Sequence, residues 1–144
     1  MRALISGPGR MTRETTDLAH LQAAYGDEQV RVWVDIIDGD EAIVEQLAAC
    51  LGIHPLVAED ILERNQRAKI ERTGDTLHIV MFALAYDGGV EEDEIDIVLG
   101  RRFLLTGHSS TFDPLQLHTL RRGSEALLEE GLDYLLWAIV DGLV

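Results

Sequence analysis

Two adjacent carboxylates, Glu59 and Asp60, are the side chains of this sequence best suited to binding a cation. They lie in residues 55–62, which predict a short helix because proline is favoured in the first helical turn. Neighbouring residues of a helix point about 100° apart, so the two carboxylates do not close one cage together. Each could give an oxygen to hydrated Mg²⁺, which keeps several waters and needs few carboxylates. Spacing alone favours an ordinary solvated acidic face.

A second candidate site is Gly107-His108-Ser109-Ser110-Thr111, which is similar to the G-x-S-x-G turn that carries the nucleophile of many hydrolases. Thr111 replaces the closing glycine, the residue that lets the strained turn fit. No other stretch supplies a clear base or orienting group, so a polar loop after a strand is the favoured interpretation. We predict that the chain is not an enzyme. A small hydrolase using His108 and Ser109 stays as an alternative.

Other polar residues give weaker signals. The histidines are scattered along the chain, at His20, His54, His78, His108 and His118. No two of them have the spacing of zinc ligands, and we expect His78 to be packed within a strand. The acidic run at residues 91–96 lacks the glycine and the spacing of an EF-hand loop. We interpret that run as a charged strand edge that resists aggregation.

Composition narrows the function classes. The 144 residues are 47% hydrophobic, which suits one domain, residues 1–144. The formal net charge of -14 disfavours binding to nucleic acid or to an anionic membrane surface, and it attracts multivalent cations. The same charge would also simply keep a domain soluble. A lone Cys50 predicts a reducing compartment. No run of about 18 apolar residues is present, so this chain is not expected to span a membrane.

Alternating and helical hydrophobic patterns predict an α/β fold with a mixed, partly antiparallel sheet sandwiched between helices. The strands at residues 29–36 and 91–99 are each expected to bury one face. A helix is expected to begin at Pro114, to break or bend near Gly123 and to end at Gly131. The remaining strands are predicted at residues 2–6, 68–72, 76–86 and 102–106, and the remaining helices begin near residues 17, 40, 55 and 132.

Five short motifs, taken in order and spacing, give a more specific indication. They are Trp33-Val34-Asp35, His54-Pro55-Leu56 with Glu59-Asp60-Ile61-Leu62, Gln66-Arg67-Ala68-Lys69-Ile70-Glu71, Phe103-Leu104-Leu105-Thr106, and Asp133-Tyr134-Leu135-Leu136 with Ile139-Val140-Asp141. Over about residues 30–144 the chain resembles the N-terminal cytoplasmic domain of the CorA family of magnesium and cobalt transporters. One departure is Ala68, where the family usually has proline. The first thirty residues match nothing specific.

The resemblance implies a protein that is larger than this chain. Members of the family resemble one another in forming homopentamers with two membrane helices and a Gly-Met-Asn motif at the pore mouth. None of that apparatus is in this sequence, so the chain alone is not expected to transport ions. The sequence stops within an apolar helical pattern at Val144, which predicts a piece of a longer protein. The resemblance places it on the cytoplasmic side of the inner (plasma) membrane, joined to its own stalk and transmembrane helices.

The resemblance also assigns roles to carboxylates. Asp60 corresponds to a carboxylate that binds a regulatory divalent cation between subunits, with Glu59 and Asp141 as neighbours in a second site. The partner carboxylate of the stalk helix lies beyond Val144, so we expect this chain to bind Mg²⁺, or Co²⁺, weakly. The expected function is a cation-sensing regulatory domain. Two alternatives stay open: the cytoplasmic domain of a related zinc transporter, and a free-standing acidic binding domain without a transport role.

Overall fold

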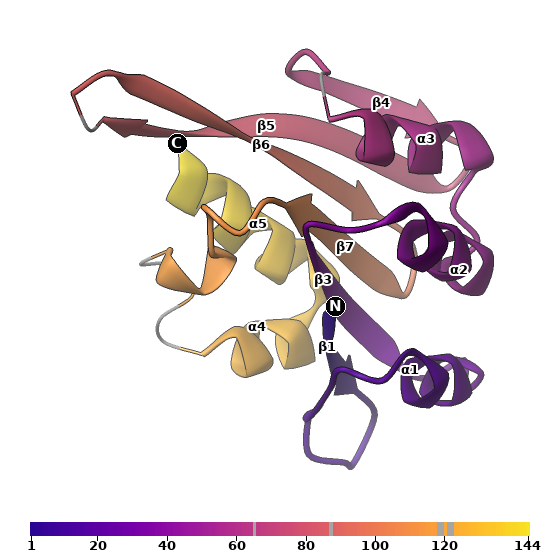
Figure 1. Cartoon of the computed structure of the whole chain (residues 1–144). Coiled ribbons are helices and arrows are strands. Elements are labelled where there is room, and N and C mark those ends of the chain that lie inside the picture. Colours follow the sequence, from indigo (N-terminus) through magenta and orange to yellow (C-terminus); the bar gives the residue numbers. More distant parts are fainter. Residues whose placement is uncertain (65, 87, 118–119, 121–122) are drawn as a thin grey trace.

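The fold is a seven-stranded sheet with helices on both faces (Figure 1). The computed structural model describes residues 1–64, 66–86, 88–117, 120 and 123–144. Across the sheet the strand order is β2-β1-β3-β7-β6-β5-β4. In chain order the strands are β1 (Arg2–Ser6), β2 (Arg13–Thr15), β3 (Arg31–Ile37), β4 (Lys69–Thr73), β5 (Thr76–Tyr86), β6 (Val90–Leu99) and β7 (Phe103–His108).

The centre of the sheet joins two parts of the chain that are far apart in sequence. β3 and β7 run parallel, with Val34 opposite Leu105, and the other described pairings are antiparallel. On its other side β7 pairs with β6, so that Leu105 also faces Val98. The predicted mixed, partly antiparallel sheet is therefore confirmed.

Helices cover the two faces in separate groups (Figure 1). One face is covered by α1 (Leu18–Tyr25), α2 (Glu41–Leu51) and α3 (Pro55–Glu63). The other face is covered by the 3₁₀ turn η1 (Pro114–Gln116), α4 (Ser124–Glu130) and α5 (Leu132–Leu143). This arrangement confirms the predicted sheet sandwiched between helices.

Local sequence explains where α2 begins and ends. The Asp40 carboxylate accepts a hydrogen bond from the Ile43 N–H at 2.8 Å, which satisfies one of the free donors of the first turn. Gly52 ends the helix in the left-handed conformation (φ 76°), where a side chain would be strained. Between these residues Val44, Leu47 and Leu51 lie on the buried side of the helix. Helix α3 follows directly after α2 and packs on the same face of the sheet.

The prediction that residues 29–36 and 91–99 bury only one face is wrong. Val34 packs beneath α1–α3, while Trp33 packs on the opposite face beneath α4 and α5. Likewise Val98 and Ile97 lie on opposite faces, and both are buried. The reason is that β3 and β6 are interior strands, so helices shield both of their faces. Polar residues on these strands are buried as a consequence.

The region after β7 also differs from the prediction. The expected helix beginning at Pro114 is a single 3₁₀ turn that ends when Leu117 adopts an extended conformation (ψ 128°), and α4 begins only at Ser124. Leu115 and Leu117 pack against the core beneath α4 and α5. Their burial, rather than helical periodicity, determines the path of the chain here. His118 lies outside the described residues. The three-residue strand β2 was not predicted.

Candidate metal centre

Helix α3 holds the two candidate carboxylates on a well-defined frame. The Nδ1 atom of His54 accepts a hydrogen bond from the Leu56 N–H at 3.1 Å and caps the helix, and Pro55 fills the first turn. The helix ends at Arg64, whose φ of 49° places it in the left-handed region. The buried face of α3 packs against the sheet. Glu59 and Asp60 are therefore held on the outer side of a helix whose position is fixed.

Asp60 faces the start of β4. Its Oδ2 lies 3.0 Å from the Lys69 ammonium, which lies 3.3 Å from Glu71 as well. Hydrogen bonding to Asp60 is the largest of the effects that together raise the pKa of Lys69 above its usual value. The Asp60 side chain is 29% exposed. Its charge is thus compensated within the chain, yet the carboxylate can still be reached from solvent.

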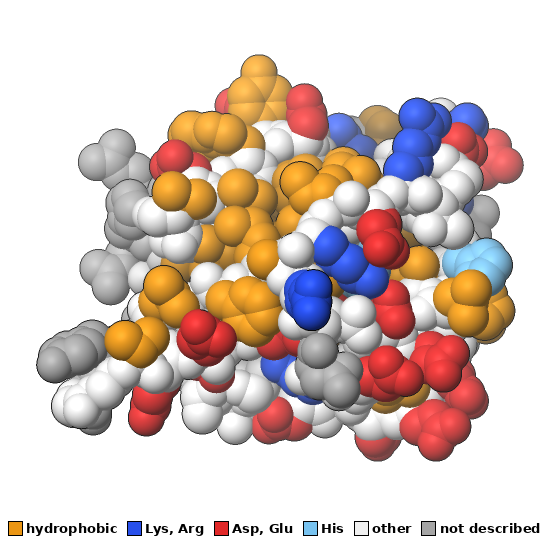
Figure 2. Space-filling model, turned by 90° about the horizontal axis from the view of Figure 1, so that it is seen from above, with side chains coloured by type: hydrophobic (Ala, Val, Ile, Leu, Met, Phe, Trp, Pro, Cys, Tyr) orange, Lys and Arg blue, Asp and Glu red, His pale blue; other side chains and the backbone are white. Residues whose placement is uncertain are grey.

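Glu59 points elsewhere, as its place one residue earlier on the helix predicts. It is exposed and lines a groove of about 580 Å³ between α2 and α3, together with Glu41 and Glu45. Apolar residues such as Ile53 line the rest of this groove. Seen from above, acidic side chains gather on the side of the molecule where α2 and α3 lie (Figure 2). Asp60 and Glu59 therefore belong to two different surroundings.

Asp141 is not brought to these residues by the fold of this chain. It is exposed on α5, which covers the opposite face of the sheet from α3. Within the described residues, no group of three His, Cys, Asp or Glu side chains converges in a way that could hold a metal ion. The donor set nevertheless suits a hard cation in part, because Asp60 offers an accessible carboxylate and Mg²⁺ keeps most of its waters.

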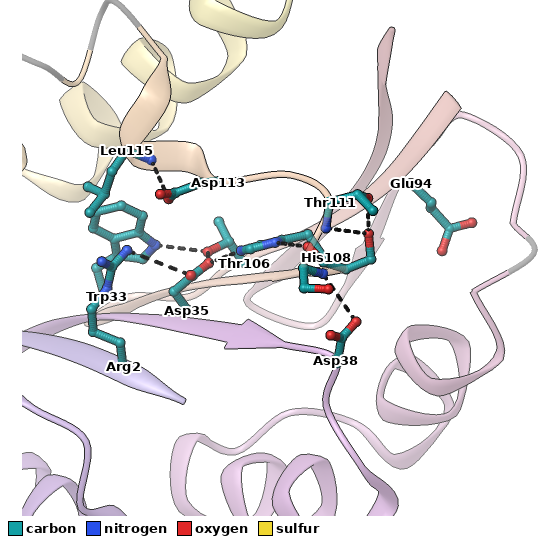
Figure 3. Close-up of polar contacts among 12 residues, drawn as sticks. Arg2, Trp33, Asp35, Asp38, Glu94, Thr106, His108, Thr111, Asp113 and Leu115 are labelled. Carbon is teal, nitrogen blue, oxygen red and sulfur yellow. Dashed lines mark hydrogen bonds and ion pairs between the residues drawn. The ribbon is translucent and has the colours of Figure 1, made fainter. Parts of the chain in front are cut away.

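A buried polar network crosses the other face of the sheet (Figure 3). The Trp33 Nε1–H donates to the Thr106 hydroxyl at 3.0 Å, and that hydroxyl donates to Asp35 Oδ1 at 2.6 Å. His108 Nε2 lies 2.8 Å from the same carboxylate oxygen. Arg2 lies 3.8 Å from Asp35 Oδ2. This network joins β1, β3 and β7, and it contains the Trp33–Asp35 motif noted in the sequence.

The same network argues against the hydrolase hypothesis, because it engages the histidine that would have to act as the base. His108 Nδ1 lies 2.8 Å from the Ser109 carbonyl, and Nε2 faces Asp35, so both ring nitrogens are engaged with acceptors. Burial lowers the pKa of His108, but the hydrogen bond and charge of Asp35, with the Ser109 carbonyl, outweigh it and leave the pKa raised. The Ser109 hydroxyl instead contacts Thr111 at 2.5 Å and Asp93 at 3.3 Å. The nucleophile–base contact that this hypothesis needs is absent from these described residues.

The interpretation of residues 91–96 as a charged strand edge is wrong for part of the run. Strand β6 lies between β5 and β7, and both Glu94 and Asp96 are buried. Asp96 Oδ1 lies 2.9 Å from His78 Nε2, which confirms that His78 is packed within a strand. The signal that sequence reasoning missed is the alternation of Glu94, Asp96 and Val98, three residues that share one face of a strand.

Comparisons with known proteins identify the family. The family described as "CorA-like Mg2+ transporter protein" matches residues 28–144. This chain belongs to the CorA family. It is 28% identical over 138 residues to the cobalt/magnesium transport protein CorA of Thermotoga maritima, covering 91% of this chain and 39% of that protein. This chain spans well under half the length of that curated relative.

Solved structures agree on the fold. The soluble domain of CorA from Methanocaldococcus jannaschii superposes with a TM-score of 0.69 at 19% identity, covering 98% of this chain and 55% of that one. The cytoplasmic domain of ZntB from Vibrio parahaemolyticus gives 0.66 at 13% identity, covering 99% and 57%. At these identities the likeness concerns the fold alone. Of the helices that the structure describes in this CorA-family chain, none is long and apolar enough to cross a bilayer.

Proposed function

We propose that this chain is the cation-sensing regulatory domain of a CorA-like magnesium transporter, and that Asp60 supplies one side of its regulatory site. Family membership over residues 28–144 and the fold support a domain of this kind. The observation that carries the proposal is the position of Asp60, an accessible carboxylate paired with Lys69, on a capped helix that packs against the sheet. A divalent cation would take the place of the Lys69 ammonium as the counter-charge.

The electrostatics of the chain favour such an exchange. A net charge of -14 concentrates cations around the domain. The Asp60–Lys69 pair is partly exposed, so holding it together contributes about 0–1 kcal/mol, which a divalent ion can replace. Because the described residues of this chain offer only Asp60 and Glu71 around the Lys69 ammonium, binding of a divalent cation to this chain alone is expected to be weak. Tight binding would need an oxygen ligand from another chain.

The proposed assembly is a homopentamer on the cytoplasmic side of the inner (plasma) membrane, joined to its own stalk and transmembrane helices. In that arrangement Asp60 of one subunit would face a carboxylate of the next subunit. Glu59 and Asp141, which lie on opposite layers of one chain, would contribute to a second site. A cation that bridges two subunits would stabilise the closed pore by its difference in affinity between the closed and open states.

The transported ion is a separate question. We propose Mg²⁺, with Co²⁺ as a second substrate, because the His54–Leu62 segment resembles the magnesium and cobalt branch. The fold alone does not separate this branch from the zinc transporters, since ZntB superposes almost as well as CorA. A free-standing acidic binding domain without transport is the other alternative. Competition of Mg²⁺, Co²⁺ and Zn²⁺ for uptake by the full-length protein distinguishes these possibilities.

The test of the regulatory role uses the full-length transporter with the substitution Asp60→Ala. We expect inhibition by internal Mg²⁺ to need a concentration about tenfold higher, because one charged ligand of the site is gone, while uptake at low Mg²⁺ is retained. Asp75→Ala is the matched control, since Asp75 also forms an exposed ion pair, with Arg101 at 3.2 Å, and neither residue belongs to α3. Equal Mg²⁺ inhibition in the Asp60 variant and the wild type would refute the proposal.

A further inference from the structure

Beneath α3 lie three titratable side chains that share an unusual property. Glu94 and Asp96 are alternate residues of β6, and His78 is on the neighbouring strand β5. They are 7%, 0% and 1% exposed. Glu94 Oε2, Asp96 Oδ2 and His78 Nδ1 are buried and make no hydrogen bond with the described residues. Buried polar atoms without partners are rare because each costs free energy, so this buried carboxyl cluster calls for an explanation.

Glu94 also fastens the end of α3 to the sheet. The Gln66 N–H donates to Glu94 Oε1 at 2.7 Å, and the Arg64 guanidinium donates to the Glu94 main-chain oxygen at 2.9 Å. Arg64 is the residue that ends α3, and its N–H bonds to the Asp60 carbonyl at 3.4 Å. We call Arg64, Gln66 and Glu94 the helix clasp. It joins the C-terminal end of α3 and the chain that follows to the interior of the sheet.

The charges of the cluster do not balance without a proton. Glu94 faces Asp96 on its own strand, and Arg64 from the end of α3. His78 reaches the cluster from β5 through its contact with Asp96. Two ionised carboxylates here would repel each other in a buried place, with one oxygen of each lacking a donor. A single carboxylic O–H between Glu94 Oε2 and Asp96 Oδ2 would satisfy both oxygens at once.

We propose that Glu94 and Asp96 form a buried proton-binding site, in which one shared proton keeps the helix clasp closed. Burial and the charge of Asp96 raise the pKa of Glu94 above its usual value, against the Gln66 N–H and Arg64. When the proton leaves to a solvent base, Glu94 becomes an anion beside Asp96. Repulsion then drives its carboxylate outward, and the contact with the Gln66 N–H is lost.

Such a site makes the hold on α3 depend on pH. The helix that bears Glu59 and Asp60 is fastened at its C-terminal end when the proton is bound, and is released there when it is not. The clasp would form whether or not a cation binds at Asp60, because none of its hydrogen bonds involves the Asp60 carboxylate. The proton site therefore stands or fails separately from the regulatory cation site.

The direct test is an NMR titration of the 144-residue chain between about pH 4 and pH 9, following side-chain carboxyl carbons. We expect the Glu94 carbon to titrate at higher pH than the envelope of the exposed glutamates. Over the same interval the amide of Gln66 should lose at least about tenfold of its protection against hydrogen exchange, after correction for the intrinsic rate. If Glu94 titrates with the exposed glutamates, or if the protection of Gln66 stays constant, the proposal is wrong.

Variants separate the shared proton from simple burial. Glu94→Gln keeps an acceptor for Gln66 and an amide donor for Asp96, so Gln66 protection should become independent of pH. Asp96→Asn removes the facing charge, so Glu94 should titrate at lower pH than in the wild type. Glu92→Gln is the control, because it removes an exposed carboxylate of the same strand and should leave the wild-type profile unchanged. Should Glu94→Gln not fold, the wild-type titration decides alone.

Discussion

The two faces of the sheet each bury a histidine against an aspartate, and the two pairs are built differently. On the α4–α5 face, His108 meets Asp35 at 2.8 Å, and on the α3 face His78 meets Asp96 at 2.9 Å. In the first pair both histidine nitrogens face acceptors, and Asp35 Oδ1 also accepts from the Thr106 hydroxyl. Asp35 Oδ2 makes no hydrogen bond with the described residues, but it lies 3.8 Å from Arg2. The second leaves one histidine nitrogen and one aspartate oxygen without a hydrogen bond to the described residues.

This difference shows that a buried histidine–aspartate pair can stabilise the fold in one place and lie beside a group that responds to pH in another. The first pair engages both histidine nitrogens and has Arg2 as a counter-charge, so it holds three strands in register, because a shift would leave a buried charge without its partner. A pair with unsatisfied atoms next to a second carboxylate, Glu94, has a reason to bind a proton. It also lies beside the helix that carries the candidate cation ligand. We expect the first pair to contribute more to stability, and each face to respond to pH through a different group, His108 on one and Glu94 on the other.

The largest expected effect is that of Asp35→Asn. The substitution leaves His108 buried with its Nε2–H facing a neutral amide and removes the counter-charge of Arg2. Breaking a buried charge pair in this way typically costs about 3–5 kcal/mol. Urea unfolding measures the loss directly.

Asp96→Asn is the matched comparison on the other face. We expect it to cost less than half as much, because the new amide can donate to Glu94 and relieves repulsion between two carboxylates. If both asparagine variants lose the same stability, the distinction between the Asp35–His108 pair and the Asp96–His78 pair is wrong.

The next effect is the pH dependence that each face contributes. His108 has a raised pKa, so the folded chain binds its proton more tightly than the unfolded chain. That stabilisation is complete below the unfolded value of about 6.5 and is lost as pH rises through the folded pKa. Thermal unfolding from pH 5 to pH 9 tests it, with His108→Gln as the non-titrating variant.

Glu94 makes stability change with pH in the same direction as His108 does, but over a lower range of pH. Its raised pKa means that stability falls as pH rises from its usual 4.5 through the folded value. The curves of Glu94→Gln and wild type should therefore separate at lower pH than those of His108→Gln and wild type. If both variants departed from the wild type over the same range of pH, the comparison would be wrong, because the two faces would then titrate together.

Much of the fold was predictable because its signals are local. Alternation of apolar residues and caps such as Asp40 mark individual elements, and each needs only a few neighbouring residues. The burial of both faces of β6 was not predictable in this way. It depends on β6 lying between β5 and β7, and on two separate layers of helices, which are facts about the whole chain. An acidic run that looks like a solvated edge is therefore partly interior.

The residues of the candidate site were likewise predictable where the signal is local and unpredictable where it depends on the whole fold. Glu59 and Asp60 were found because helical spacing and an adjacent pair of carboxylates are visible in nine residues. The partner of Asp60 was not predicted, since Lys69 reaches it only when β4 returns beside α3. The contact between His78 and Asp96 spans eighteen residues and two strands, and that between Asp35 and His108 spans seventy-three. Contacts of that range follow from strand order, which motif spacing does not contain.

A smaller loss of stability is expected for Trp33→Phe, which tests one hydrogen bond of the network around Asp35 and His108. The indole N–H is the donor that orients the Thr106 hydroxyl towards Asp35. Losing one neutral hydrogen bond while the ring remains buried should cost about 1–2 kcal/mol in urea unfolding. Trp137→Phe is the control, because Trp137 is 61% exposed and should change stability by less than about 0.5 kcal/mol. Equal losses would mean that the indole N–H does not support the Asp35 network.

The smallest effect on stability, and the one that links the comparison to function, is that of Lys69→Met. Its pair with Asp60 is partly exposed, so losing it should change stability by less than about 1 kcal/mol. The carboxylate is then left without its nearest positive charge. Two unit charges 4 Å apart in water interact by about 1 kcal/mol, so Mg²⁺ should bind this chain up to about fivefold more tightly. Arg101→Met, which removes the partner of Asp75, is the matched control and should leave Mg²⁺ binding unchanged. Isothermal titration of both variants measures the difference, and weaker Mg²⁺ binding by Lys69→Met would mean that the lysine supports the site rather than competing for it.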